Sequence, residues 1–174
     1  VTYTYALQVK LADPTIYVGD ATAATATYIT YADGVQSSTK DVTSSATWSS
    51  GTTAVATVSG GTVSAIATGT SEISASYNGY SAKTSVTVED NITYDYQLTP
   101  TSTSLVNGRT TKFTVVKRTF TNGTQTNGQD VSSTFTWTSS NTSVATVGSN
   151  GVVTGAGKGT ATITAKYGET TLTG

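Results

Sequence analysis

Carboxylates are the side chains of this chain that are best suited to chemistry. The sequence holds ten Asp and Glu residues but no histidine and no cysteine. It therefore lacks the usual general base, the commonest transition-metal ligand and the thiolate nucleophile. A pair of carboxylates could still cleave a glycosidic bond, but the acidic residues are scattered singly along the sequence. We therefore expect no catalytic site and interpret the chain as non-enzymatic.

The densest group of oxygen ligands lies half-way along the chain and consists of Glu89, Asp90, Asn91 and Asp95. Calcium binds several such oxygens at once. No second acidic loop accompanies this group to complete the coordination, so a solvated acidic linker is the simpler interpretation. We expect no cofactor, and calcium at this position is the metal hypothesis that the sequence leaves open.

Aromatic side chains could bind sugars or proteins wherever their rings are exposed. Trp48 and Trp137 are flanked by threonines at inward positions of predicted strands, so we expect both in the core. Other aromatic residues allow two interpretations, cover for a sheet face or a binding surface: Tyr3, Tyr5, Tyr17, Tyr28, Tyr31, Tyr80, Tyr94 and Tyr96. A weak carbohydrate-binding module is therefore one alternative function, with surface glycans as its ligands.

Basic residues concentrate on one predicted strand, at Arg109, Lys112, Lys117 and Arg118. A charged strand of this kind commonly protects a sheet edge from unwanted pairing, and a patch for acidic ligands is the alternative. The net charge of -1 gives no electrostatic footprint for nucleic acid. No stretch approaches the roughly 20 apolar residues of a membrane span. We expect neither nucleic-acid binding nor membrane insertion.

The segments that must position these side chains occur twice in the sequence. The run D-V-T-S-S-A-T-W at 41–48 returns 89 residues later as D-V-S-S-T-F-T-W at 130–137. The same offset aligns V-A-T-V at 55–58 with V-A-T-V at 144–147. Each copy is long enough to bury a core of its own and too long for a solenoid repeat. The chain is therefore predicted to hold two tandem domains, residues 1–90 and 91–174.

Apolar residues alternate with threonine and serine along most of both copies. At 160–167 this alternation places Ala161, Ile163, Ala165 and Tyr167 on one face, as expected for a half-buried antiparallel strand. Many short strands with Asn-Gly turns between them favour an all-β fold of two tandem Ig-like antiparallel β-sandwiches. The predicted core residues are Trp48, Val58, Ile73, Phe135, Trp137, Val147 and Ile163.

One run of the second copy resembles a known family. It reads W-T-S-S-N-T-S-V-A-T-V at 137–147, then N-G-V-V-T at 150–154 and G-K-G-T-A-T-I-T-A at 157–165. These motifs resemble the group 2 bacterial immunoglobulin-like (Big) domains, and the first copy is similar more loosely. The resemblance implies an Ig-like fold without a disulfide. It also implies a spacer, decoration or adhesion role on bacterial surface proteins, or on the tails and capsids of phages.

The two ends of the second copy carry further expectations. The joint at 89–91 is short, which favours a semi-rigid rod over two freely moving domains. The second copy has no counterpart of S-V-T-V at 85–88, so its last strand is expected to be incomplete. Residues after Gly174 would complete it in a longer chain. In a complete mature chain, the run 1–7 of a neighbouring copy would do so and build a fibre.

The leading functional hypothesis is a non-enzymatic extracellular structural or adhesion module of a bacterial surface protein. The second is a self-assembling subunit of a surface fibre or virion, joined by strand exchange. The expected partners are proteins or further copies of the chain, and the expected location is the surface of a bacterial cell or a virion.

Overall fold

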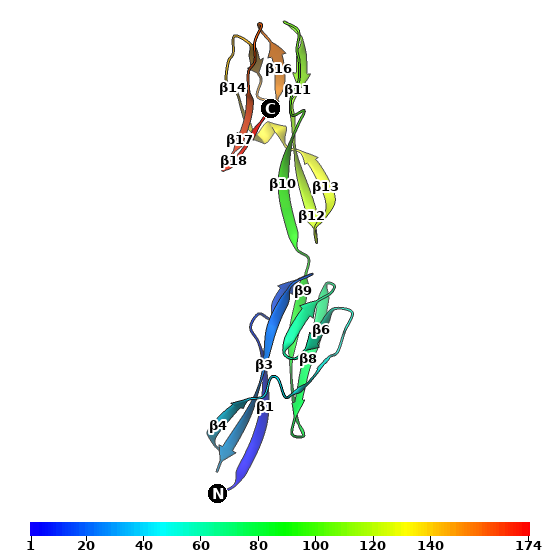
Figure 1. The fold of residues 1–174 in the computed structure, drawn as a ribbon, viewed down its shortest axis with the longest axis vertical. Coiled ribbons are helices and arrows are strands. Elements are labelled where there is room, and N and C mark those ends of the chain that lie inside the picture. Colours follow the sequence, from blue (N-terminus) through cyan, green and yellow to red (C-terminus); the bar gives the residue numbers. More distant parts are fainter. The chain divides into compact units, whose positions relative to one another are not determined.

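The computed structural model describes residues 1–174, and its regular structure is nearly all β, with 62% of the chain in strands and 2% in helix. The predicted all-β class with Ig-like sandwiches is confirmed. The chain divides into two compact units, Val1–Asn91 and Ile92–Gly174, which are described in turn (Figure 1). None of its helical structure has the length and apolarity that a membrane crossing would need.

The first unit packs two sheets face to face. One sheet has the order β1-β3-β7-β6 with β4 added to β3, and the other has the order β2-β9-β8-β5. Its strands are β1 (Tyr3–Leu11), β2 (Thr15–Tyr17), β3 (Ala21–Ala32), β4 (Val35–Asp41), β5 (Thr47–Ser50), β6 (Ala56–Ser59), β7 (Thr62–Ala65), β8 (Gly69–Tyr77) and β9 (Tyr80–Glu89). Strands β2 and β9 pair in parallel, whereas the other ladders are antiparallel.

The second unit repeats this plan in three small sheets, β10-β12-β13, β11-β16-β15 and β14-β17-β18. Its elements are β10 (Ile92–Thr99), β11 (Thr110–Lys112), β12 (Thr114–Thr121), β13 (Thr124–Asp130), the 3-10 turn η1 (Ser132–Thr134), β14 (Thr136–Ser139), β15 (Ala145–Val147), β16 (Val152–Gly155), β17 (Ile163–Tyr167) and β18 (Thr170–Thr173). Strands β11 and β12, separated only by Phe113, together correspond to the long strand β3.

The repeat extends to irregular features of the backbone. The β3–β4 ladder shifts register between Thr30 and Tyr31, and the β12–β13 ladder shifts between Thr119 and Phe120, 89 positions further on. In both ladders the hydroxyl of the extra residue, Ser37 or Thr126, donates to the carbonyl before the shift. A β-bulge is one extra residue in one strand, and the pairing of two strands does not by itself require it. Two bulges at equivalent positions show that the two units share one fold plan.

Alternation along the strands determines the core of each unit. In the first unit Val63, Ile73, Val86 and Val88 point inward and are buried, together with Leu11 and Ile16. In the second unit the core is formed by Leu98, Phe113, Val115, Phe135, Trp137, Val153, Ile163 and Ala165. Outward positions between them carry mostly threonine and serine, whose short polar side chains suit a solvated β-surface.

The units fill their cores with aromatic rings at different positions. Phe135 is buried between Tyr96 and Tyr167, with ring centroids 5.5 and 5.6 Å away. The first unit has the small Ala46 in place of Phe135, and Leu7 in place of Tyr96. In the first unit, aromatic rings at other sequence positions therefore fill the space that Phe135 and Tyr96 occupy in the second unit.

Candidate functional site

The four acidic and amide residues considered for calcium lie at the junction of the two units in sequence. Glu89 ends β9, where its backbone carbonyl accepts a hydrogen bond from the Val18 amide. Asp90 and Asn91 follow with exposed side chains. Asp95 belongs to β10 and forms an ion pair with Arg118 of its own unit. No three Asp or Glu side chains of the chain form a group that could hold a metal ion.

Asp95 forms a two-pronged ion pair with Arg118 on the neighbouring strand β12. Nε and Nη2 of Arg118 donate to the two carboxylate oxygens at 2.7 and 2.5 Å. This geometry is the strong form of an Arg–carboxylate pair, and it raises the pKa of the Arg118 guanidinium chiefly through the hydrogen bond. Lys117 lies over the Tyr94 ring at 3.9 Å, and Lys112 pairs with Asp130. Three of the four predicted basic residues are therefore engaged within their own unit.

The duplicated run ending in tryptophan forms a hydrogen-bonded latch, which we define as Asp130, Ser132 and Trp137 in the second unit. The Ser132 amide and hydroxyl both donate to Asp130 Oδ1. The Ser132 hydroxyl accepts from the amide of Val115, and the Ser132 carbonyl accepts from Trp137 Nε1 at 2.9 Å. One short turn thus ties the end of β13, strand β12 and the core tryptophan together.

The first unit contains the same latch, formed by Asp41, Thr43 and Trp48. The Thr43 amide donates to Asp41 Oδ1 at 2.8 Å, its hydroxyl accepts from Ala26, and its carbonyl accepts from Trp48 Nε1 at 2.9 Å. Hydrogen bonds from Thr43 lower the pKa of Asp41, and hydrogen bonds from Ser132 lower that of Asp130, with a smaller contribution from Lys112. The motif found twice in the sequence therefore has a structural purpose.

The predicted core residues lie as follows. Trp137 is 8% exposed, and Phe135, Ile73 and Ile163 are buried. Val58 and Trp48 are half-buried against the core of the first unit, and Val147 packs against that of the second. Because both indole N–H groups bind backbone carbonyls, neither tryptophan presents a free polar edge to a ligand.

A groove of about 500 Å³ runs along the second unit, lined among others by Leu105, Phe113, Val153 and Ile163. In the first unit the corresponding space is filled by the last part of β9, whose Val86 and Val88 are buried between β8 and β2. The second unit has only the four-residue β18 on β17, and Gly174 lines the groove.

The run 1–7, considered above as a donor for this groove, already has a partner. Residues Tyr3–Leu11 form β1 and pair along their whole length with β3 of the same unit. Donating this segment to another copy would break that ladder. Donation of the N-terminal run to another copy would therefore first require β1 to leave β3.

Four tyrosines gather on the first unit, and we call them the tyrosine cluster: Tyr5, Tyr28, Tyr77 and Tyr80. Tyr5 stacks on Tyr28 at 5.5 Å, and Tyr77 and Tyr80 meet Tyr28 edge-on at 5.4 and 5.8 Å. Partial burial raises the pKa of the Tyr28 hydroxyl, and the neighbouring phenols add to this effect. The rings come from β1, β3 and the β8–β9 hairpin, so the cluster exists only in the folded unit.

The sequence alone did not single out Tyr77, or the groove beside it. This groove, of about 390 Å³, is lined by residues of the β8–β9 turn and by Ser45 and Thr47. An available signal was the pattern Y-N-G-Y at 77–80, in which a turn places two aromatic rings opposite each other. Its significance depends on the strands that pack around the turn, which the pattern does not specify.

Comparison with known proteins finds a family match for the second unit. Residues 94–173 match the bacterial Ig-like domain (group 2). The chain is also 38% identical over 145 residues to ice-binding protein 1 of Shewanella frigidimarina (strain NCIMB 400), which covers 80% of the chain. The chain spans 16% of the length of that relative.

Solved structures of a surface-layer protein are also similar. Domains 4 and 5 of the S-layer protein SbsC align over 96% of this chain and 94% of theirs, with 22% identity and a TM-score of 0.42. Domains 1–6 of the same protein align over 96% of this chain and 26% of theirs, with the same identity and TM-score.

Proposed function

We propose that the chain is a non-enzymatic structural module of a bacterial surface or secreted protein, in which two Ig-like sandwiches space or present other parts. The observation that carries the proposal is the tandem repeat of one fold plan, one copy of which matches a bacterial Ig-like family. A relative much longer than this chain supports a role as part of a larger protein.

The first unit belongs, in this proposal, to the same family as the second. It has the same antiparallel strand pairings, the same bulge in its long ladder and the same latch of carboxylate, hydroxyl and indole. These features involve backbone and side-chain geometry together, so they support common descent by duplication more strongly than composition does.

A surface-display experiment tests the spacer role. The chain is inserted between a cell-surface anchor and a reporter domain, and binding of a bulky antibody to the reporter is measured. The control replaces the chain with an unrelated two-domain Ig-like protein. We expect both inserts to raise antibody binding equally over a direct fusion. An insert that fails to raise it would contradict spacing.

Display also separates spacing from adhesion. Cells that carry the chain without a reporter should adhere to host-matrix proteins and to other bacteria no better than cells that carry the control. Adhesion conferred by the chain itself would replace the spacer role with an adhesin role.

Assembly into a fibre by strand exchange is the second candidate. The groove beside Ile163 in the second unit, also lined by Leu105 and Phe113, is the place where an exchanged strand would bind. In the single chain β1 is paired with β3, so a donor other than β1 would leave the first unit intact. Sedimentation velocity over a hundredfold range of concentration tests this candidate. Growth of the sedimentation coefficient is expected for a fibre, and a constant monomer would contradict it.

A further inference from the structure

The sequence holds five Asn-Gly pairs, at 78–79, 107–108, 122–123, 127–128 and 150–151. In such a pair the backbone nitrogen of the glycine can attack Cγ of the asparagine carboxamide, because glycine has no side chain to shield that nitrogen. The reaction also requires the two atoms to approach each other closely. The backbone geometry at each pair therefore determines which asparagine reacts.

Two of the pairs are protected by backbone hydrogen bonds of the glycine nitrogen. The Gly108 amide donates to the Gly155 carbonyl at 2.8 Å, and the Gly151 amide donates to the Gly148 carbonyl at 3.0 Å. Each N–H is thus directed at a backbone oxygen and away from the side chain of the asparagine before it. Neither nitrogen is placed for attack.

Two further pairs form the turns of β-hairpins. Asn78 and Asn122 have φ values of +50° and +52°, and the glycines that follow them also have positive φ. Two successive residues of this kind make a type I′ turn. In the left-handed conformation the next backbone nitrogen lies anti to Cβ about the Cα–C bond, so the carboxamide carbon cannot reach it.

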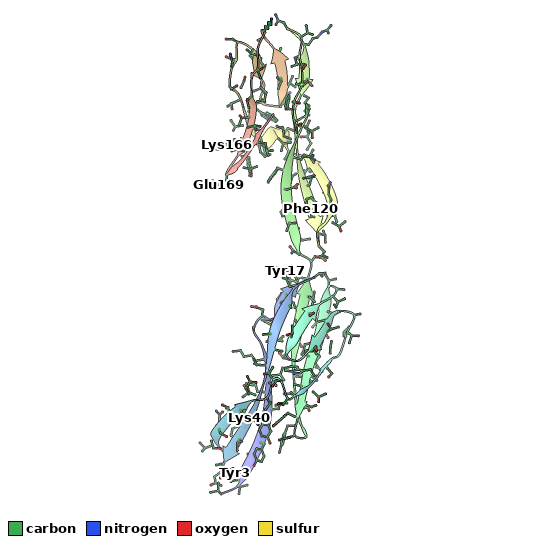
Figure 2. All side chains as sticks on the ribbon, viewed as in Figure 1. Tyr3, Tyr17, Lys40, Phe120, Lys166 and Glu169 are labelled. Carbon is green, nitrogen blue, oxygen red and sulfur yellow. The ribbon has the colours of Figure 1, made fainter.

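The remaining pair, Asn127-Gly128, has a different geometry. Both residues are exposed on β13, which is an edge strand of its sheet. Phe120, labelled in Figure 2, lies on β12 beside the bulge that precedes Asn127 (Figure 2). The Gly128 amide donates to Oδ1 of Asn127 at 2.8 Å. The nitrogen therefore already points at the carboxamide that it would attack.

The Gly128 amide has no role in the ladder to β12. The Val131 amide donates to the Val115 carbonyl, which fixes the alternation of hydrogen-bonded and non-hydrogen-bonded pairs along these strands. By this alternation Gly128 and Arg118 form a non-hydrogen-bonded pair, so the Gly128 N–H points away from β12. Removal of its proton would leave an electron pair directed at the Asn127 side chain and would break no bond of the sheet.

The first unit provides an internal comparison. Ser38 and Thr39 of β4 stand in place of Asn127 and Gly128, 89 positions earlier. The first unit forms the same bulged hairpin with these residues. The fold therefore does not require an Asn-Gly pair inside the strand.

We propose that Asn127 is the residue of this chain at which spontaneous deamidation begins. Hydroxide removes the amide proton of Gly128, and the nitrogen forms a bond to Cγ of Asn127. The Cγ–Nδ2 bond then breaks, and ammonia leaves with a proton from water, which regenerates hydroxide. Water opens the resulting cyclic imide at either carbonyl and gives aspartate or isoaspartate.

The modification changes the second unit near its latch. Both products add a negative charge to β13, and isoaspartate also adds a carbon atom to the backbone of the strand. The change falls three residues before Asp130, the carboxylate of the latch. Ageing of the chain should therefore loosen the end of β13 and destabilise the second unit.

Peptide mapping of the aged chain tests the proposal. The full 174-residue chain is incubated in warm, mildly alkaline buffer, and mass spectrometry after digestion follows the conversion of each asparagine. Asn127 should convert at least about tenfold faster than Asn122, although both lie in the sequence T-N-G. In concentrated guanidinium chloride, where the backbone geometry is lost, the two rates should become similar. Equally fast conversion at another Asn-Gly pair of the folded chain, or a ratio that persists in denaturant, would overturn the proposal.

Two variants copied from the first unit test the chemistry and its consequence. Gly128→Thr shields the nitrogen and should slow conversion of Asn127 at least about tenfold. Asn127→Ser removes the carboxamide, so its second unit should keep its urea midpoint on ageing, whereas that of the original chain should fall. Melting temperatures of the fresh chains identify a variant that does not fold, and the other variant then decides. Undiminished conversion in folded Gly128→Thr, or equal loss of stability in aged Asn127→Ser and the aged original, would refute the proposal.

Discussion

Gly151 shows how a single atom constrains the latch. Its φ is +78°, and an added Cβ would lie 2.9 Å from the Trp137 ring and closer still to the Phe113 carbonyl oxygen. The Gly151 backbone is also tied to the core, because its carbonyl accepts a hydrogen bond from the amide of Phe113. The position therefore requires both a left-handed backbone and the absence of a side chain.

We predict that Gly151→Ala destabilises the second unit by about 3 kcal/mol or more, since backbone strain and a steric clash add together. Gly123→Ala is the matched control, with the same φ of +78° and no atom near its added Cβ. It should cost only about 1 kcal/mol. Urea denaturation followed by tryptophan fluorescence measures the free energy of unfolding of both variants. Equal losses of stability in the two variants would show that the neighbouring atoms move to relieve the clash at residue 151.

The latch carboxylates predict how stability depends on pH. In the folded chain the pKa values of Asp41 and Asp130 are lowered below the ordinary value of an aspartate, chiefly by the hydrogen bonds from Thr43 and Ser132. The unfolded chain therefore binds more protons between the two pKa values, and stability falls as pH decreases below about 4 through the folded values. Above that range the contribution is fully present.

Replacing Asp41 and Asp130 by Asn should flatten this part of the stability curve while lowering stability at neutral pH. Urea midpoints between pH 2 and 7 measure the effect. If the double variant shows the same acid-induced loss as the original chain, that loss arises from carboxylates other than those of the latch.

At the scale of elements, the clearest contrast is between strands that alternate and strands that do not. The strand near 160–167 was predicted from its alternating apolar residues, and β17 forms within it, though only from Ile163. Strands β4 and β13 were missed because every one of their residues is exposed. Without a buried face there is no period of two in the sequence, and only the Asp-Gly and Asn-Gly turns before them hint at hairpins.

The groove beside the β8–β9 turn could not be predicted for a related reason. Its residues come from Ser45 and the start of β5 and from the β8–β9 turn, which are distant in sequence and meet through the β5–β8 ladder. The latch was visible as a repeated motif, but its hydrogen bonds depend on how Ser132 faces Val115 across a gap of 17 positions. Sequence patterns identify faces of strands and do not identify which faces meet.

The filled and open grooves of the two units lead to a prediction at the same scale. Fusing the run S-V-T-V-E of 85–89 to Gly174 should extend β18 and place two valines beside Leu105 and Ile163. We expect the melting temperature of the second unit to rise by several degrees, because burial of each valine contributes about 1.5 kcal/mol or more.

The matched control for this fusion is S-S-T-S-E, which offers the same backbone without the apolar side chains. It should stabilise much less when both chains are compared by differential scanning calorimetry. Equal effects of the two extensions would assign the gain to backbone pairing alone.

At the scale of the whole molecule, each unit has its own core and its own latch. Trp48→Ala should therefore weaken protection from hydrogen exchange in the first unit alone, and Trp137→Ala should weaken it in the second unit alone. For the buried Trp137 we expect the free energy of unfolding of its unit to fall by about 3–5 kcal/mol. Hydrogen exchange measured by mass spectrometry reports both units in one chain. Loss of protection in both units from a single substitution would show that they unfold together.

The parallel pairing of β2 with β9 has a consequence for a chain under tension. Tension along the first unit pulls β9 toward its C-terminal end and draws β2, through β1, the opposite way. The ladder at Thr15–Tyr17, with the flanking bonds from Thr87 to Pro14 and from Val18 to Glu89, is then loaded in shear. Bonds loaded in shear must fail together, whereas a hairpin pulled from its open end loses its bonds singly. A strand of three residues thus acts as a mechanical clamp when the first unit is pulled from its two ends.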